Sequence, residues 1–503
     1  MAGTSQPAAP VHAVRLAYHI DEGPRIIVRR ILIAGYQRTR PGIIRREVLL
    51  RGGEPLRQMD AVETQRRLYN LGIFNRVSVA PQNPDGTDPQ KDAVVMVEEG
   101  KRYTVSYGGG FEVQRLGSST DPTGGAFSFS PRGIIELAKN NLTGRADTLA
   151  LKIRGSTLQG RGVLSYTSPD TFGQRNLSFQ ATAYAEKARD VSTFTAERVE
   201  GSVQLTDTVS QWTNLFFRYS FRDVRVADLR IPPQEVPLFN QPTLVSMFGM
   251  TWFRDRRDNP GDPNKGSYNN VDVGIAGTRI GSSANFARFF AQNSSYTPLG
   301  RRFTFARSTR FGILEPYGST VSLPFPPPTT PPFPVVIPLP ERFFAGGGTS
   351  LRGFALNQAG PRDPTTGFPI GGQALLVLNQ ELRFPMRLPL VGSRLGGALF
   401  YDGGNVYSRL NRITFRVSPP KPAFDPANPQ QCLLNCTNEL NYFSHTIGFG
   451  VRYATPVGPI RVDLGYLLNR ADFLIPCTSG APNCQQVTHL PHFQVFFNLG
   501  TVF

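Results

Sequence analysis

The sequence predicts a transmembrane antiparallel β-barrel of sixteen strands that follows a small α/β domain. Three observations predict this fold. The odd-numbered side chains of Phe493–Phe503 form one largely apolar face, as in a strand against lipid. Turn-forming and aromatic residues are abundant, with Gly 50, Pro 43, Phe 36 and Tyr 16. No apolar run approaches the ~18 residues of a membrane-spanning helix, so we expect the chain to cross a membrane with strands.

The formal net charge of +17 is spread along the chain rather than gathered on one stripe. Arginines recur within alternating segments such as Arg218–Arg222 and Arg301–Arg307. This pattern favours a cationic barrel lumen over a nucleic-acid surface, and we expect no nucleic-acid partner.

The first hundred residues combine short strands with two amphipathic helices. Strands are predicted over 26–34, 77–80 and 93–98, and helices over 41–50 and 59–71. Gly72 is placed to end the second helix. The order strand, helix, helix, strand, strand predicts a compact α/β domain. The start of the chain shows no signal peptide, which we interpret as a mature or truncated chain.

From Tyr103 onward the apolar period becomes two, as in Thr148–Arg154. The predicted strands are 103–112, 131–140, 146–155, 160–168, 176–186, 191–206, 211–226, 244–257, 267–278, 284–296, 301–315, 371–385, 393–405, 443–455, 459–469 and 490–503.

Short and long connections alternate, the asymmetry typical of a membrane barrel. Two long connections hold all four cysteines, Cys432 with Cys436 and Cys477 with Cys484. We expect disulfides formed in an oxidising compartment. Pairing within each loop is the simplest of three arrangements, and a cross-loop pairing stays open.

One long loop contains GGGTSLRGF, in which Arg352 is flanked by glycines. The hinge glycines Gly346, Gly347, Gly348 and Gly353, followed by Phe354, allow a sharp turn. An arginine there is either solvated or paired with buried carboxylates. Glu381 and Asp402 are the candidate partners, because each is embedded in a predicted strand, where an unpaired charge is costly.

The first predicted strand contains Gly108, Gly109 and Gly110, and the last one ends at Phe503. Consecutive glycines weaken a strand. They indicate either a bend near the rim or a weak seam between the first and last strands.

Motifs for chemistry are lacking in the sequence. Gly348–Gly353 does not have nucleophile-elbow spacing, and the aspartates after Arg254 lack calcium-loop spacing. We expect no enzymatic activity, no cofactor and no metal.

The first hundred residues resemble a POTRA domain. The matching segments are Ile31–Gly35, Leu68–Val77 and Val95–Gly100. The resemblance implies a POTRA domain over 25–101 and a barrel over 102–503. Residues 1–24 are then the tail of a preceding POTRA domain or a linker.

The remainder resembles the BamA/TamA family of outer-membrane assembly factors. The matching motifs, in family order, are Arg254–Pro260, Ser350–Phe354, Phe400–Asn405 and Gly448–Tyr466. The resemblance implies that the loop carrying Arg352 folds into the barrel, where Arg352 pairs with Glu381 and Asp402. It also implies a seam, between the first strand and the last, that opens sideways.

The implied function is folding and insertion of β-barrel clients in the bacterial outer membrane, with the POTRA domain in the periplasm. The implied partners are unfolded clients, outer-membrane lipid and lipopolysaccharide, and accessory lipoproteins bound through POTRA. Two alternatives stay open, a transporter of the two-partner secretion type and a passive porin.

Overall fold

The structure is a computed structural model that describes residues 25–499, apart from 87, 116–121, 124–126, 170, 242, 389–391, 425–431, 456–458 and 478–484. The chain divides into two compact units. One holds the residues up to Lys101 together with Thr143–Ala146, and the other holds Arg102–Leu142 and the chain from Asp147 onward. The predicted tail 1–24 and Phe503 lie outside the described residues.

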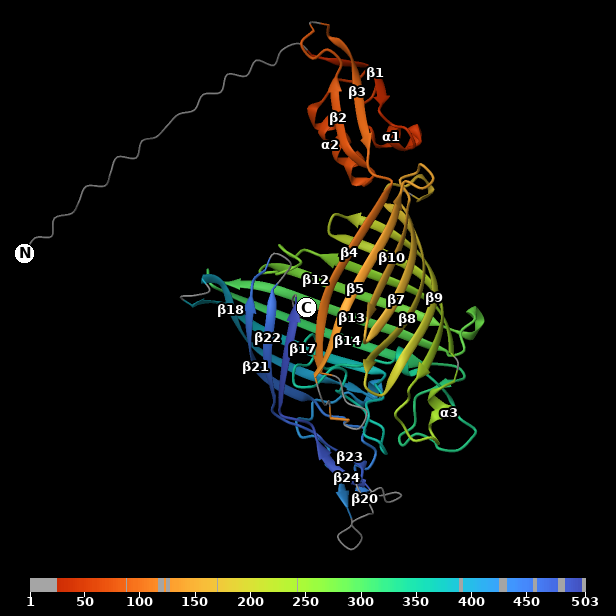
Figure 1. The fold of residues 1–503 in the computed structure, drawn as a ribbon, viewed down its shortest axis with the longest axis vertical. Helices are drawn as coiled ribbons and strands as arrows, with labels where there is room; N and C mark the ends of the chain where they lie inside the picture. Colours follow the sequence, from red (N-terminus) through yellow and green to blue (C-terminus); the bar gives the residue numbers. More distant parts are fainter. Residues whose placement is uncertain are drawn as a thin grey trace, which may run out of the picture. The chain divides into compact units, whose positions relative to one another are not determined.

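The first unit is an α/β domain with the predicted order of elements. These are β1 (Ile27–Ala34), α1 (Pro41–Glu47), α2 (Gln58–Asn70), β2 (Phe74–Pro81) and β3 (Gln90–Glu99). The sheet order is β1-β3-β2, with β3 parallel to β1 and antiparallel to β2 (Figure 1).

The core of this domain is apolar. Ile44 of α1 and Leu68 of α2 pack with Val77, Val95 and Val97 of the sheet, all nearly inaccessible to solvent. The first helix ends at Glu47, three residues earlier than predicted, because Val48 is already extended. Burial of these side chains, rather than helix propensity, holds the two short helices in place.

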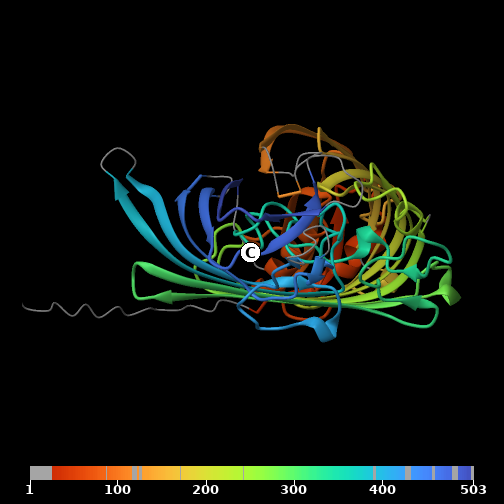
Figure 2. The ribbon, with the colours of Figure 1, turned by 90° about the horizontal axis from the view of Figure 1, so that it is seen from below.

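The second unit is built on one sixteen-stranded sheet, so the predicted fold class is confirmed. Its strands, in chain order, are β4 (Tyr103–Arg115), β5 (Phe127–Asn140), β6 (Thr148–Ser156), β7 (Gln159–Ser168), β8 (Leu177–Val191), β9 (Phe194–Ser210), β10 (Thr213–Ala227), β11 (Thr243–Asp255), β12 (Gly266–Ala276), β13 (Phe286–Leu299), β14 (Phe303–Pro316), β17 (Ala374–Leu388), β18 (Gly392–Tyr407), β21 (Ser444–Tyr453), β22 (Ile460–Leu467) and β25 (Phe493–Leu499). Every neighbouring pair in this sheet is antiparallel, and the sheet curls around the loop segments that join β14 to β17 (Figure 2).

Alternation gives this sheet an apolar outer face. On β25, Phe493, Val495 and Phe497 are exposed, whereas Gln494 and Phe496 between them are buried. The same alternation exposes apolar side chains on many other strands. An exposed apolar band on a curled sheet is the surface that a lipid bilayer covers.

The sheet has two edge strands, β4 and β25. Across the part of the chain that the structure describes, no ladder of hydrogen bonds joins them. We call the end of the barrel where β4 begins the proximal end, and the opposite end the distal end.

The distal connections contain short elements that the sequence did not predict. They are α3 (Val236–Phe239), β15 (Thr320–Val321), β16 (Val335–Val336), β19 (Ala423–Phe424), β20 (Cys432–Leu434), β23 (Asp472–Pro476) and β24 (Gln485–His489). Single turns of 3-10 helix lie at Thr171–Gly173, Thr278–Ile280, Leu339–Glu341 and Leu410–Arg412. No helix in the described ranges is long and apolar enough to cross a membrane.

Candidate functional site

The long connection between β14 and β17 carries a tight turn over Gly346–Phe354. Gly346 and Gly347 have φ of 120° and 98°, in the left-handed region that favours glycine. The Gly347 N–H donates to the Phe354 carbonyl oxygen at 2.9 Å, and the Gly346 N–H donates to Ser350 Oγ at 2.8 Å. These bonds close the turn and leave Arg352 at its tip.

Arg352 is completely buried and contacts Asp402 on β18 through three donors. Its Nε and Nη2 donate to the two carboxylate oxygens of Asp402, each at 2.8 Å, and its backbone N–H donates to Asp402 Oδ2 at 3.0 Å. The contact is therefore bidentate and charge-assisted, with an extra bond from the main chain.

Two further carboxylates and an aromatic ring surround the same guanidinium. Arg352 Nη1 donates to Glu381 Oε2 on β17 at 3.1 Å and lies 3.8 Å from Asp463 Oδ2 on β22. The guanidinium carbon lies 3.4 Å from the ring centroid of Phe400, a cation–π geometry. Sequence reasoning named Glu381 and Asp402 but missed Asp463.

Two glycines in the wall make room for the loop. The register aligns Glu381, Phe400, Gly448 and Gly465 in one row across β17, β18, β21 and β22. A Cβ at Gly448 would clash with the Phe400 ring, and one at Gly465 would clash with the Arg352 carbonyl oxygen. The row is thus a recess that holds the ring and the loop backbone.

The hinge residues lie close to the wall as well. A Cβ at Gly353 would clash with the Thr446 hydroxyl on β21, and one at Gly348 would clash with Asn498 on β25. Phe354 is buried in the large apolar cluster of the barrel unit. The turn therefore lies against β18, β21, β22 and β25 through backbone contacts that a larger residue would disturb.

The charges around Arg352 continue toward the proximal end. Arg383 Nε donates to Glu381 Oε1 at 2.8 Å, and Arg452 donates to the same oxygen. Arg461 Nη1 lies 3.7 Å from Asp463 Oδ2. The cluster comprises the arginines Arg352, Arg383, Arg452 and Arg461 and the carboxylates Glu381, Asp402 and Asp463. The alternation of β22 could have identified Arg461 and Asp463 from the sequence, because a period of two places them on the same face of the strand as Gly465.

The seam candidates Gly108, Gly109 and Gly110 lie in the middle of β4, where they pair with β5. A Cβ at Gly108 or Gly110 would meet no atom within 4 Å, so packing does not require glycine there. These glycines lie on an edge strand, and they pair in order with Ile134, Gly133 and Arg132 of β5.

Cys432 and Cys436 form a disulfide within one distal loop. Cys477 is also disulfide-bonded, and Cys484 lies outside the described residues. Among the described side chains, no group of three or more His, Cys, Asp or Glu residues could hold a metal ion.

Two family profiles match the chain. One, described as the Omp85 superfamily domain, matches residues 141–501. The other, a POTRA profile described as a surface antigen variable number repeat, matches residues 26–100. The second match lies in the N-terminal unit, and the first covers the barrel unit from the end of β5 onward.

Similar proteins include two named outer membrane protein assembly factor BamA. The one from Neorickettsia risticii is 25% identical over 90% of this chain and 54% of its own length. The one from Neisseria meningitidis is 22% identical over 92% of this chain and 57% of its own length. The chain thus spans about half the length of these relatives.

A similar solved structure is that of BamA from Haemophilus ducreyi lacking POTRA domains 1–3. It aligns with a TM-score of 0.68 at 18% identity, over 96% of this chain and 85% of the other. The likeness concerns the fold.

Proposed function

Because the chain belongs to the Omp85 superfamily, we propose that it folds and inserts β-barrel clients through a seam between β4 and β25. It is an outer-membrane protein whose N-terminal domain is periplasmic. Since β4 begins four residues after β3 ends, the proximal end of the barrel faces the periplasm.

The observation that carries this proposal is the pair of edge strands. A strand edge presents unpaired N–H and C=O groups, and it is a template for another strand. In lipid such groups have no water to bind, so a client strand needs a partner as it enters. The edges of β4 and β25 supply that partner. The catalysis is therefore physical, and we propose no enzymatic step.

We propose that the Arg352 cluster keeps the wall beside the seam rigid. The cluster lies on β17, β18, β21 and β22, the strands that precede β25 in the sheet. Because buried ion pairs hold the wall next to β25, we propose that the glycine-containing strand β4 is the part that moves when the seam opens. Arg352, Glu381 and Asp402 are positioning residues in this proposal.

For the domains we propose POTRA over 25–101 and the barrel over 102–503, with 1–24 as the tail of a preceding POTRA domain or a linker. The strands β1 and β2 are the edges of the N-terminal sheet. They are suited to bind unfolded clients or accessory lipoproteins by strand addition. Outer-membrane lipid and lipopolysaccharide are proposed to contact the exposed apolar band.

The test is to lock the seam. Cysteine pairs, one in Tyr103–Gly110 and one in Phe493–Asn498, are joined by a bifunctional thiol reagent in the purified protein. Insertion of a client barrel into liposomes is then followed by protease protection. We expect linked protein to lose insertion, while single-cysteine controls treated alike keep it. Undiminished insertion by fully linked protein would rule out the seam.

A further inference from the structure

The outward face of the wall formed by β12, β13, β14 and β17 carries a group of polar side chains. On β14, Arg307 is exposed, whereas both of its neighbours along the strand are buried. On β17, Gln380 is exposed between Asn379 and Glu381, which are buried and face the lumen. Arg307 and Gln380 are paired in the register, so they lie side by side on the outside of the barrel.

The register extends this pair into two polar rows. Arg307 also aligns with Ser295 on β13, which aligns in turn with Ser267 on β12. The same three strands contribute a second row, which lies nearer to the distal end. The outer polar patch, as we call both rows together, consists of Ser267, Asn269, Asn293, Ser295, Arg307, Thr309 and Gln380. Each row crosses at least three neighbouring strands, so the patch is a continuous polar surface.

Apolar side chains border this patch on both sides along the strands. Toward the proximal end, the outward side chains of β14 are Phe303 and Phe305. Toward the distal end they are Phe311 and Ile313. Strand β17 repeats the pattern, with leucines on either side of Gln380 on its outward face. The patch therefore lies within the apolar band that a bilayer covers, and not at the edge of that band.

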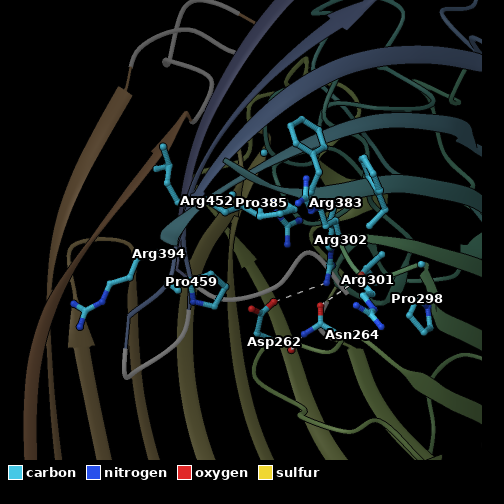
Figure 3. A pocket seen from close by; sticks show the side chains of 18 residues that line it. Asp262, Asn264, Pro298, Arg301, Arg302, Arg383, Pro385, Arg394, Arg452 and Pro459 are labelled. Atoms are coloured by element: carbon cyan, nitrogen blue, oxygen red, sulfur yellow. Dashed lines mark hydrogen bonds and ion pairs between the residues drawn. The ribbon is translucent and has the colours of Figure 1, made fainter. Parts of the chain in front are cut away.

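The proximal rim of the same wall has arginines of its own. Arg301 and Arg302 are exposed in the turn between β13 and β14, where they line a cavity of about 480 Å³ at the proximal end (Figure 3). Arg307 does not line this cavity, and the outward rings of Phe303 and Phe305 lie between it and the turn. Arg301 and Arg302 are thus placed to meet water and lipid headgroups, and Arg307 needs a different partner.

Neutral groups hold the guanidinium of Arg307 against the wall. Its Nε donates to Ser295 Oγ at 2.9 Å, and its Nη2 donates to Asn293 Oδ1 at 3.4 Å. Asn293 Nδ2 donates in turn to Asn269 Oδ1 at 2.6 Å. Because Asn293 belongs to the row nearer the distal end, the Arg307 side chain turns away from the proximal rim. Within the described chain, Arg307 pairs with no carboxylate and its Nη1 donates to no acceptor.

An arginine at this place is costly if lipid alone covers it. Hydrocarbon neither accepts hydrogen bonds nor solvates a charge, and an arginine on the lipid face of a barrel is most destabilising at mid-depth. A polar covering removes this cost, and it has to bring a negative charge, because the patch has one cation and no anion. A two-fold contact between copies of this chain lacks that charge, since it sets one Arg307 against another.

We propose that the outer polar patch is a docking surface for the membrane-spanning wall of a different protein, which places a carboxylate opposite Arg307. The serines and asparagines of the patch then exchange hydrogen bonds with polar side chains of that partner. At least three strands lie between the patch and either edge strand of the sheet. The partner therefore leaves the seam free, and its docking is a property beyond the proposed insertion of clients.

The first test measures the cost of Arg307 when no partner is present. The purified full chain is folded into phosphatidylcholine liposomes, and its urea midpoint is measured. Arg307→Leu is expected to raise the midpoint, because it removes a charge from the lipid face. Arg218→Leu is the matched control, because Arg218 is an exposed arginine on the lumen face of β10, and it is expected not to raise the midpoint. An unchanged or lowered midpoint for Arg307→Leu would overturn the proposal.

The second test identifies the covering in native outer membranes. A photoreactive benzoylphenylalanine replaces Leu378, which aligns with Thr309 at the margin of the patch, and the adducts are analysed by mass spectrometry. We expect a protein adduct within a membrane-spanning segment that is lost with Arg307→Leu and kept with Arg307→Lys. Replacing the partner's nearest carboxylate by an amide is expected to remove the same adduct. The control carries the probe at Phe217, which is exposed on the outward face of β10, and is expected to give no such adduct.

The absence of a protein adduct, an adduct that persists with Arg307→Leu, or the same adduct from the probe at Phe217 would each overturn the proposal. Adducts with lipid alone that depend on Arg307 would overturn it in favour of a lipid headgroup drawn into the wall. An adduct between two copies of this chain would overturn it in favour of self-association.

Discussion

Arg29 in the N-terminal domain and Arg352 in the barrel each pair with carboxylates, but they differ in exposure to water. The Arg29 side chain is 51% exposed and donates to Asp92 at 2.8 Å, and only the Asp92 side chain of this pair is buried, whereas Arg352 and its partners are all fully buried. A pair in which one charge stays in water contributes little, because solvent screens it. Buried pairs become costly to break, because removing one partner leaves the other without solvation.

The difference shows what holds each region together. The N-terminal domain is stabilised by its apolar core around Leu68 and Val95, with ion pairs at its surface. The barrel unit also has a buried apolar cluster, which includes Leu351 and Phe354, but beside it Arg352 is buried among Asp402, Glu381 and Asp463. Inside the barrel, buried ion pairs are therefore added to the burial of apolar side chains.

Replacing Arg352 by alanine is expected to have the largest effect. The loss leaves Asp402 and Glu381 without their shared partner, and removing one member of a buried pair costs about 3–5 kcal/mol. The expected result is reduced assembly and loss of heat-modifiable electrophoretic mobility. Arg256→Ala, at an exposed proximal position, serves as the control. Native-like mobility of the Arg352→Ala protein would contradict the role given to this residue.

Gly465→Val probes the recess without removing a charge. The added atoms clash with the Arg352 carbonyl oxygen, and overpacking of this kind costs about 1–3 kcal/mol. We expect a lower urea midpoint and faster proteolysis of the loop that carries Arg352. Gly162→Val is the matched control, because a Cβ at Gly162 meets nothing within 4 Å. An equal effect of both substitutions would show that the recess has no special role.

Glu99→Gln tests a carboxylate in the N-terminal domain. Burial raises the pKa of Glu99, but donors from the backbone and side chain of Thr39 and the backbone of Arg38 and Gln37 outweigh it and lower the pKa. A lowered folded-state pKa gives stability that is present above the unfolded value of about 4.3 and is lost as the pH falls through the folded value.

For this partly exposed carboxylate we expect Glu99→Gln to cost about 1 kcal/mol at neutral pH. The cost should disappear in acid. The measurement is proteolysis of the N-terminal domain in the full chain at increasing urea concentration, at pH 7 and at pH 3. A cost that is the same at both values would mean that the charge of Glu99 is irrelevant.

Arg29→Ala is expected to have the smallest effect on the urea midpoint, because the guanidinium is exposed to water. In this variant Asp92 keeps Arg30 as a partner at 2.9 Å. The hydrogen bond from Arg29 is the larger cause of the lowered pKa of Asp92, and the hydrogen bond from Arg30 is the next. Urea unfolding at low and high salt is the measurement. A loss as large as that of Arg352→Ala would remove the contrast between the two regions.

Much of the fold follows from local sequence. The period of two gave sixteen strands, and the structure has sixteen in one sheet, with boundaries that differ by a few residues. The resemblance to the BamA/TamA family is confirmed by the matching profiles and relatives. The short distal strands β15, β19 and β23 escaped prediction, because two to five residues carry too little periodicity.

The site was harder to predict from the sequence than the fold, because its residues are brought together by the register between strands. Glu381 and Asp402 stood out as carboxylates within predicted strands, and both contact Arg352. Nothing in the local sequence distinguishes Asp463 and Arg461 from other polar residues of a strand, and their place beside Arg352 follows only from the register of β22 with β21. Gly448 and Gly465 carry no chemical signal at all, since their contribution is the absence of a side chain.

Asp402 accepts both the guanidinium and the backbone N–H of Arg352. Side chain and main chain are thus tied to one anchor, so the tip of the loop cannot slip while its charge stays seated. Moving the tip of the loop away from β18 therefore breaks the side-chain and main-chain bonds to Asp402 together.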